Sequence, residues 1–327
     1  MNRLNALAIG TKLLSVWLFR HRIPLSVGWA VTKRCNGRCT YCGKWTDPND
    51  DTPPDEALTL CNQIVDAGTR IISLTGGEPL LRDDIEGLIR RLKEGGVYII
   101  LATNGMLLPE KLDVVKHVDR LNISLDGPRE VNDAFRGPGS FDHSVKAIKT
   151  ARAAGIPVVL TTVLHAANID HMESMFQLAA DLGCRINIQP VIHNEESSAF
   201  DPETIPTPEQ MHGAIQMLIE EKGRSGSRLI ENSVLALRHL LEWPEGRTIS
   251  CESRLISCRA EPDGHIHNCG RRKNSLPETD YRKQGFVNAF RALPIQHCKT
   301  CWCSSRYELN MLTSLNPLLI ANMLRRF

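Results

Sequence analysis

The chain has 327 residues, of which 42% are hydrophobic, so it can bury the core of one large domain or two, and a disordered protein is excluded. Its 39 Lys and Arg residues nearly balance its 37 Asp and Glu residues, leaving a formal net charge of +2. This balance provides no overall electrostatic field, so we expect no nucleic-acid partner.

The first predicted element is an amphipathic N-terminal helix within residues 1–24. It is too short and too charged to span a bilayer. Such a helix either packs on the core or rests on a membrane surface with its basic residues at the headgroups, and both interpretations are open. Residues 318–327 have a similar character. The pattern in the first helix consists of Leu4, Leu7, Leu14, Trp17, Leu18 and Phe19 with Lys12, Arg20 and Arg22.

Six apolar runs predict β-strands, and helical patterns lie between them. The runs are continuous rather than alternating, and each connection is long enough for a helix, which indicates a parallel sheet covered on both faces. We therefore predict an α/β fold whose core, residues 25–192, is a partial (β/α)6 TIM-like barrel. The strands are expected at residues 27–31, 71–74, 97–102, 121–125, 158–163 and 186–191.

Three cysteines, Cys35, Cys39 and Cys42, follow the first predicted strand at the spacing C-x3-C-x2-C. Three thiolates this close can hold three irons of a cubane cluster, which leaves the fourth iron without a protein ligand. Four protein ligands suit electron transfer or structure, whereas an open iron can accept the amine and carboxylate of a small molecule and pass it an electron. The missing fourth cysteine therefore predicts an enzyme.

Other distinctive motifs follow the second, third and fourth predicted strands. Reactive groups of parallel β/α folds collect beyond the carboxyl ends of the strands, so we expect these motifs to share one edge with the cysteines. Glycines allow the backbone to approach a ligand closely, and the Glu that follows them supplies a negative charge. The residues concerned are Gly76, Gly77, Glu78, Pro79, Asn104, Ser124 and Asp126.

The cysteine triplet and the Gly-Gly-Glu-Pro motif together resemble the radical S-adenosylmethionine (radical SAM) superfamily, in which an aromatic residue such as Tyr41 usually precedes the third cysteine. The resemblance implies that Cys35, Cys39 and Cys42 bind a 4Fe-4S cluster whose open iron chelates S-adenosylmethionine. One electron then splits the sulfonium bond, and the resulting 5′-deoxyadenosyl radical takes a hydrogen atom from the substrate.

The same resemblance implies further contacts with S-adenosylmethionine. The motif that ends in Glu78 and Pro79 would bind its amino group. Ser124 and Asp126 lie in a Ser-Leu-Asp-Gly segment that in relatives is near the ribose and carboxylate, and Arg136 can fork onto that carboxylate. Strand-end capping by Ser124 and a solvated loop cation at Arg136 remain open, as does a plain Asn-Gly turn at Asn104.

After the predicted barrel, residues 193–246 form a helical bridge with a polar start and helices expected at 208–222 and 228–241. From residue 247 onward, short runs, Gly, Pro and Cys dominate, which indicates a small cysteine-rich domain over 247–304 without a large core. A C-terminal helix is predicted at 305–327.

Six of the eleven cysteines fall in the cysteine-rich part. A Pro-Asp-Gly hairpin turn precedes Cys269, and a C-x2-C knuckle follows, an arrangement that resembles the SPASM and shorter Twitch extensions of radical SAM enzymes. This implies an auxiliary 4Fe-4S cluster, although a structural zinc on the same thiolates is an alternative. Cys258 is expected to pack, and Cys303 is a substitute ligand or a free thiol. The implied ligands are Cys251, Cys269, Cys298 and Cys301.

Together these features predict a radical SAM enzyme whose auxiliary cluster relays an electron or supports the active-site wall. The substrate class stays open among peptides, lipids and other small molecules, although the 34 residues before Cys35 are too few for a built-in leader-peptide-binding domain. The opposing hypothesis is a non-catalytic iron-sulfur or zinc protein that carries electrons or acts as a scaffold.

Partners and location follow from the same features. We expect a flavodoxin- or ferredoxin-type electron donor. Cysteines clustered at metal-binding spacings, without a cleavable signal peptide, favour a reducing cytoplasm, and the two apolar ends add peripheral contact with the inner face of a membrane as a hypothesis. Cys61 and Cys184, outside the clusters, are expected in the core.

Overall fold

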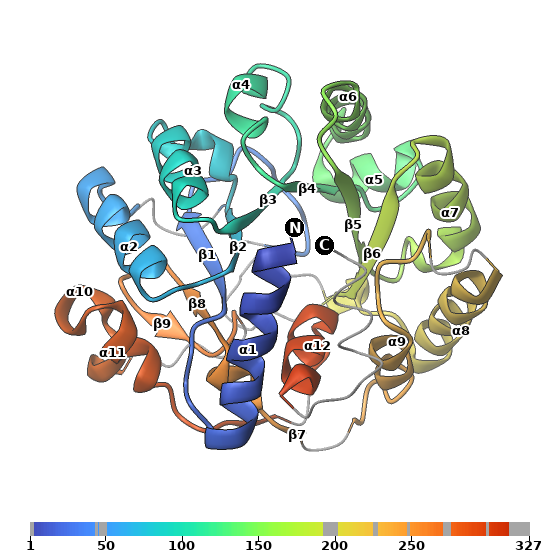
Figure 1. Ribbon diagram of the computed structural model, residues 1–327. Helices are drawn as coiled ribbons and strands as arrows, with labels where there is room; N and C mark the ends of the chain where they lie inside the picture. The colour runs from blue at the N-terminus through green and yellow to red at the C-terminus, as the bar shows by residue number, and fades with distance from the viewer. Residues whose placement is uncertain are drawn as a thin grey trace.

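The computed structural model describes residues 3–42, 45, 51–191, 202–224, 228–246, 249–270, 276–298 and 301–313. An eight-stranded sheet runs through them in the order β6-β5-β4-β3-β2-β1-β8-β9, and its first six strands are parallel neighbours in chain order. The predicted partial barrel is confirmed (Figure 1). Its strands are β1 Ser26–Thr32, β2 Ile71–Gly76, β3 Tyr98–Thr103, β4 Arg120–Ser124, β5 Val158–Leu164 and β6 Arg185–Pro190.

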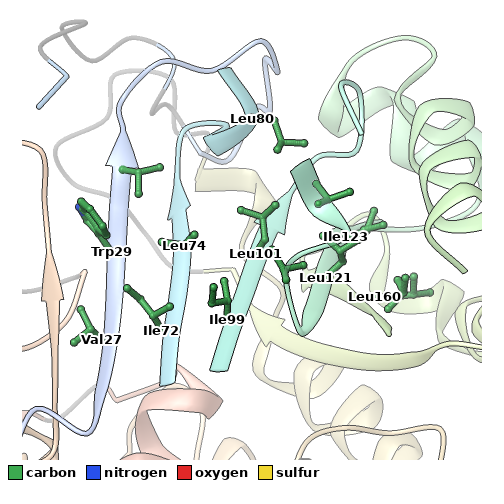
Figure 2. Packing of buried hydrophobic residues seen from close by; sticks show 14 of the residues in the cluster. Val27, Trp29, Ile72, Leu74, Leu80, Ile99, Leu101, Leu121, Ile123 and Leu160 are labelled. Carbon is green, nitrogen blue, oxygen red and sulfur yellow. The ribbon is translucent and has the colours of Figure 1, made fainter. Parts of the chain in front are cut away.

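Helices surround the outer face of this sheet and bury the main core (Figure 1). Figure 2 shows how Trp29, Leu74, Leu101 and Ile123, one from each of four neighbouring strands, point to this same side. Side chains alternate along a strand, so one face of each run is committed to this core. The outer helices are α2 Pro54–Asp66, α3 Ile85–Glu94, α4 Leu112–Val115, α6 Ser140–Ala153 and α7 Met172–Asp181. α5 Arg129–Arg136 lies between β4 and α6 in the chain, and its buried residues contact Asp126.

The inner, concave face of the sheet changes character along its height. Near the amino ends of the strands, Ile71, Tyr98 and Ile100 pack against α1 (Arg3–Phe19) and α12 (Ser304–Leu312) in a second apolar cluster. Toward the carboxyl ends, the expected cover on both faces gives way to half-buried polar side chains. We call these residues the concave polar surface: Ser73, Asn122, Ser124, Thr161 and Gln189.

The N-terminal helix packs with a different face from the one its leucines indicated. Ile9, Leu13 and Val16 are buried, whereas Leu14 and Leu18 are 51% and 53% exposed. The side chains of Leu4 and Leu7 lie outside the described residues. Basic side chains fix this orientation: the Lys12 Nζ donates to the Gly68 carbonyl (2.6 Å), and Arg20 pairs with Glu252 (2.5 Å).

The second bridge helix also begins later than expected. α8 (Pro208–Arg224) matches its prediction, but α9 (Val234–Leu240) starts only after residues 229–232 have paired with the free edge of β6. The Ile186 N–H donates to the Leu229 carbonyl, and the Asn232 side chain bonds both backbone groups of Ile188 (2.8 Å each). This pairing closes the open edge of the barrel, and it holds the chain extended where a helix was predicted.

The cysteine-rich part shares the barrel sheet. β8 (Ser257–Ala260) lies parallel to β1, and β9 (Ile266–His267) follows it antiparallel, while β7 (Ile249–Ser250) pairs with β10 (His297–Cys298). The short helices α10 (Tyr281–Gln284) and α11 (Phe286–Arg291) complete this part. The boundaries expected at residues 192, 246 and 304 stay predictions. In the ranges described here, no helix has the length and apolar character needed to cross a membrane.

Candidate active site at the carboxyl edge of the barrel

The predicted cysteine loop leaves the carboxyl end of β1, and its three cysteines are half-buried. Gly37 lies between two of the sulfurs, since a Cβ built on it would be 3.6 Å from the Cys35 Sγ and 3.8 Å from the Cys39 Sγ. The Gly37 N–H also donates to the Cys35 Sγ (3.4 Å). Burial is the main cause that raises the pKa of Cys39 to about 11, against the lowering effect of Arg136. The Cys42 and Cys35 thiols add to the increase, which indicates that the three sulfurs share one space.

This arrangement fits a 4Fe-4S cluster. Among the residues that the structure describes, no three His, Cys, Asp or Glu side chains come close enough to share a single metal ion. In a cubane each thiolate binds a different iron, so its sulfurs stand farther apart than around one zinc. Sulfurs held around Gly37 can each serve a different iron, so the loop suits the cluster, which would deprotonate the thiols when it binds.

Gly76 and Gly77 lie against the backbone that leads into Cys35, and their expected contact with an amino group stays a prediction. The Gly77 N–H donates to the Thr32 carbonyl and the Glu78 N–H to the Arg34 carbonyl (2.8 Å each). A Cβ on Gly76 would overlap the Thr32 carbonyl, and one on Gly77 would overlap the Arg34 carbonyl. Glycine is thus required at both positions because the backbone leading into Cys35 passes so close to them. These contacts hold the cysteine loop against the end of β2.

Glu78 is almost completely buried, and its carboxylate forms hydrogen bonds that connect the ends of β2 and β3. Its Oε1 accepts from the Thr103 hydroxyl (2.8 Å) and the Leu80 N–H (3.1 Å), and its Oε2 accepts from the Asn104 N–H (2.8 Å). Burial raises its pKa to about 7 against the effect of these donors. Its expected contact with an amino group stays a prediction, because the carboxylate faces inward. Pro79 is buried at the start of the short 3-10 turn that follows.

Asn104 faces the cysteine loop. Its Nδ2 donates to the Asn36 Oδ1 (2.8 Å), while its Oδ1 accepts from the Met106 N–H (3.0 Å) as in an Asn-Gly turn. The Asn-Gly turn is therefore present, and the expected contact of Asn104 with S-adenosylmethionine stays a prediction. Ser124 stands half-buried on the concave polar surface, which keeps it a candidate for ligand contact.

Asp126 is completely buried and fully engaged by protein groups. Its Oδ2 accepts from the Tyr41 hydroxyl (2.9 Å) and the Arg136 Nε (2.7 Å), and its Oδ1 accepts from the Val163 N–H (2.8 Å). The expected contact of Asp126 with a ligand stays a prediction; its carboxylate has no exposed surface and accepts from protein donors on both oxygens. Arg136 is only 8% exposed, so it is not a solvated loop cation, and its fork onto a carboxylate stays a prediction.

Sequence reasoning missed His165, which directly follows β5 and is completely buried. Its ring stacks on Phe135 (centroids 3.8 Å apart) and more loosely on Tyr41 (6.2 Å). Neither ring nitrogen has a hydrogen-bond partner among the described residues. Its place at a strand's carboxyl end, the criterion applied to the other motifs, was the signal that would have found it.

We expect replacement of His165 by Phe to remove part of the acid sensitivity of the fold. Burial lowers the pKa of His165 from 6.5 to about 4. Protonation therefore favours the unfolded chain, and the stability of the neutral ring, present above pH 6.5, is lost as the pH falls toward 4. The difference corresponds to about 3 kcal/mol. Denaturant unfolding at pH 7.5 and pH 4.5 measures it, and equal pH dependence of both proteins would contradict the assignment.

The segment with Cys301 and Cys303 lies beside the end of β6. The Gln189 Nε2 donates to the Ser305 hydroxyl (3.3 Å), which links the concave polar surface to the start of α12. Cys301 precedes that helix, and its carbonyl contacts the His239 Nε2 (2.9 Å). Cys303 is the residue directly before α12.

The remaining cysteines divide between this region and the core. The Cys251 N–H donates to the Gln296 carbonyl (2.8 Å), next to the β7–β10 pair that contains Cys298. The Cys298 side chain lies outside the described residues. Cys258, Cys61 and Cys184 are buried in the main core, the positions expected for packing residues. The four-ligand auxiliary set stays a prediction.

Comparison with known proteins shows which family contains a segment like the one that forms this site. A family model described as the radical SAM superfamily matches residues 29–179, a span from β1 to α7 that contains the cysteine loop, Glu78, Asp126, Arg136 and His165. Residues 29–179 form a radical SAM domain. The superfamily is one of enzymes whose cofactors are a 4Fe-4S cluster and S-adenosylmethionine, and the cysteine loop fits that cluster.

Curated relatives have different activities. The AdoMet-dependent heme synthase of Methanosarcina barkeri is 35% identical over 168 residues, which are 49% of this chain and 48% of the relative. The mycofactocin maturase MftC of Mycolicibacterium smegmatis is 29% identical over 258 residues, 75% of this chain and 64% of the relative. The chain thus spans about half the length of the heme synthase that it matches.

Solved structures share the fold. SuiB of Streptococcus suis bound to S-adenosylmethionine superposes with a TM-score of 0.65 at 15% identity, over 87% of this chain and 68% of that one. The enzyme anSMEcpe with bound AdoMet gives a TM-score of 0.65 at 17% identity, over 82% and 80%. Both likenesses extend beyond residues 29–179, so the fold of the C-terminal part also has counterparts in these two structures.

Proposed function

We propose that this protein cleaves S-adenosylmethionine reductively and uses the 5′-deoxyadenosyl radical to take a hydrogen atom from a substrate. The cluster, when bound, supplies the electron that divides S-adenosylmethionine into methionine and the radical. The radical becomes 5′-deoxyadenosine by gaining the substrate hydrogen. The observation that carries the proposal is the half-buried trio of Cys35, Cys39 and Cys42 around one space, without a fourth cysteine in the loop.

The concave polar surface is where this chain would hold its substrate. The Asn122 Oδ1 and the Thr161 Oγ1 are buried without hydrogen-bond partners among the described residues, on neighbouring strands β4 and β5. Buried polar atoms of this kind are costly unless something bonds them. These atoms support a substrate that presents hydrogen-bonding groups, such as peptide amides. The apolar cluster that Ile71, Tyr98 and Ile100 form with α1 and α12 excludes water from the amino-end side of the concave polar surface.

Relatives support a peptide among the substrate classes left open. One structure shows SuiB bound to its precursor peptide SuiA, and MftC is a maturase, whereas the heme synthase is not named for a peptide. We therefore propose a peptide or another polar molecule rather than a wholly apolar lipid. A flavodoxin- or ferredoxin-type protein would supply the electron.

We also propose an auxiliary 4Fe-4S cluster on Cys251, Cys269, Cys298 and Cys301. The contacts of residues 301–305 with α9 and with the end of β6 support a site next to the concave polar surface. Four protein ligands suit electron relay or support of the wall better than direct substrate binding.

Anaerobic reconstitution tests both proposals at once. The reconstituted protein receives dithionite and S-adenosylmethionine, and 5′-deoxyadenosine is measured together with iron, sulfide and zinc. We expect 5′-deoxyadenosine and about eight irons per chain, four for each cluster. An intact, reduced first cluster that forms no 5′-deoxyadenosine favours the electron-carrier hypothesis. About four irons with one zinc favours a structural zinc at the second site.

We also propose that the exposed face of α1 contacts a membrane surface. α1 turns Trp17 and Phe19 outward, 48% and 66% exposed, beside Leu14 and Leu18. An apolar face of this kind binds lipid interfaces in proportion to the area it buries. We expect the double substitution Trp17→Asp and Phe19→Asp to reduce co-sedimentation with anionic vesicles at least about tenfold. Ile295→Asp, at an equally exposed apolar residue elsewhere, serves as the control, and failure of the unaltered protein to sediment refutes the contact.

A further inference from the structure

Arg136 has an unusual position for a cation. It ends α5 with its guanidinium inside the protein, where its Nε pairs with the Asp126 Oδ2 (2.7 Å). Its Nη1 lies 4.0 Å from the Cys39 Sγ, and its Cζ lies 5.6 Å above the Tyr41 ring. The group therefore spans from the end of β4 to two residues of the cysteine loop.

Two further contacts hold this position. Tyr41 donates its hydroxyl to the same Asp126 oxygen (2.9 Å), which orients the carboxylate toward the loop. The Thr40 N–H donates to the Phe135 carbonyl (3.0 Å), which ties the loop to α5 through the backbone. The backbone tie does not depend on the charge of Arg136, so the charge can be removed while this attachment remains.

The local charge balance gives the guanidinium an electrostatic effect on Cys39. The Arg136 Nη1 reaches the Cys39 Sγ (4.0 Å), whereas both Asp126 oxygens accept from protein donors, so the charge that faces this sulfur is the positive one. Arg38, a cation of the cysteine loop itself, is exposed and donates to the Cys35 carbonyl instead. A buried charge is screened much less than an exposed one.

We infer that Arg136 is a positioning residue that holds a positive charge against the Cys39 ligand and thereby makes the first cluster easier to reduce. The inference rests on the proposed role of Cys39 as a cluster ligand. Reduction adds one negative charge to the cluster, and net charge and hydrogen bonds at the sulfurs set the potentials of such clusters. The role differs from a fork onto the carboxylate of S-adenosylmethionine, which would change binding of that molecule instead.

An EPR-monitored redox titration tests this role on the reconstituted full chain. The signal followed is the one that changes when S-adenosylmethionine is added, so it reports the first cluster. We expect Arg136→Gln to disfavour one-electron reduction at least about tenfold, which is a 59 mV shift to lower potential. Arg136→Lys keeps the charge, and we expect it to stay within about threefold of the unaltered protein.

Arg129→Gln is the matched control. Arg129 begins the same helix, but its exposed guanidinium pairs with Asp142 and touches no cysteine. We expect the potential of this variant to be unchanged. An unchanged potential in Arg136→Gln, or a weaker affinity for S-adenosylmethionine as its only defect, would overturn the inference.

A second substitution keeps the test decisive if Arg136→Gln loads no iron. Asp126→Asn removes the opposing negative charge but keeps an oxygen that accepts hydrogen bonds, so we expect reduction to become easier by about threefold or more. Unchanged or harder reduction in this variant overturns the inference. Failure of the proposed function itself would show differently, as an unaltered protein with no cluster signal that responds to S-adenosylmethionine.

Discussion

Replacing Cys39 with alanine is expected to abolish formation of 5′-deoxyadenosine, with a loss of at least about a thousandfold in single-turnover rate. Cys39 lies between the other two thiols of the loop in sequence, and its Sγ borders both Gly37 and Arg136. Without this thiolate one iron loses its protein ligand, and a buried guanidinium is left facing an empty position. Both effects act against assembly of the cluster.

Cys61→Ala provides the control for this experiment. Cys61 is buried in α2, where its Sγ lies 3.7 Å from the Leu88 carbonyl, far from the loop. Its loss leaves a small cavity that costs about 1 kcal/mol of stability, so activity per folded molecule should be unchanged. Retention of more than about a tenth of the activity in Cys39→Ala would remove this residue from the proposed ligand set.

The second large effect is expected from Gly77→Ala, which adds a single methyl group. The new Cβ would overlap the Arg34 carbonyl, and backbone on both sides leaves no flexible side chain to yield. The loop that carries Cys35 must then move away from β2, which breaks the Gly77–Thr32 and Glu78–Arg34 hydrogen bonds. We expect a loss of about 3 kcal/mol or more in stability and an iron content near zero at the first site.

Gly87→Ala separates this effect from the general consequences of replacing glycine. Gly87 lies exposed in α3, and a Cβ there meets nothing within 4 Å. Alanine in that helix should stabilise the protein by about 0.5–1 kcal/mol and leave the iron content unchanged. Equal iron in Gly77→Ala and the unaltered protein would show that the loop can shift without losing its sulfurs.

Local patterns were sufficient for the barrel and for the location of its site. Each of the six strands lies within a residue or two of its expected bounds, because runs such as Val158–Leu164 are apolar and short. The topology then required the motifs to meet at one edge, and Cys35, Glu78 and Asp126 do follow the carboxyl ends of β1, β2 and β4 there. Strand order and motif order were both available in the sequence.

The sequence alone does not show which side chains contact each other in the folded protein. Asp126 and Arg136 are ten residues apart, and nothing local indicates that they pair with each other inside the protein. Residues 229–232 favour a helix by composition, but their pairing with β6 depends on strand atoms more than forty residues away. α1 is apolar around most of its circumference, so its leucine spacing could not identify the buried side.

Because β8 pairs in parallel with β1, the C-terminal cysteine-rich part and the strand that leads to the first cysteine loop belong to one sheet and cannot be separated without breaking it. Four residue pairs join these strands, from Ser26 with Ser257 to Trp29 with Ala260, so the strand that launches the first cysteine loop is flanked on one side by C-terminal sequence. A fragment ending before residue 249 would leave β1 as a bare edge, open to association with other chains. Limited proteolysis that removes the last 80 residues should therefore cause aggregation and should not release a stable, monomeric barrel.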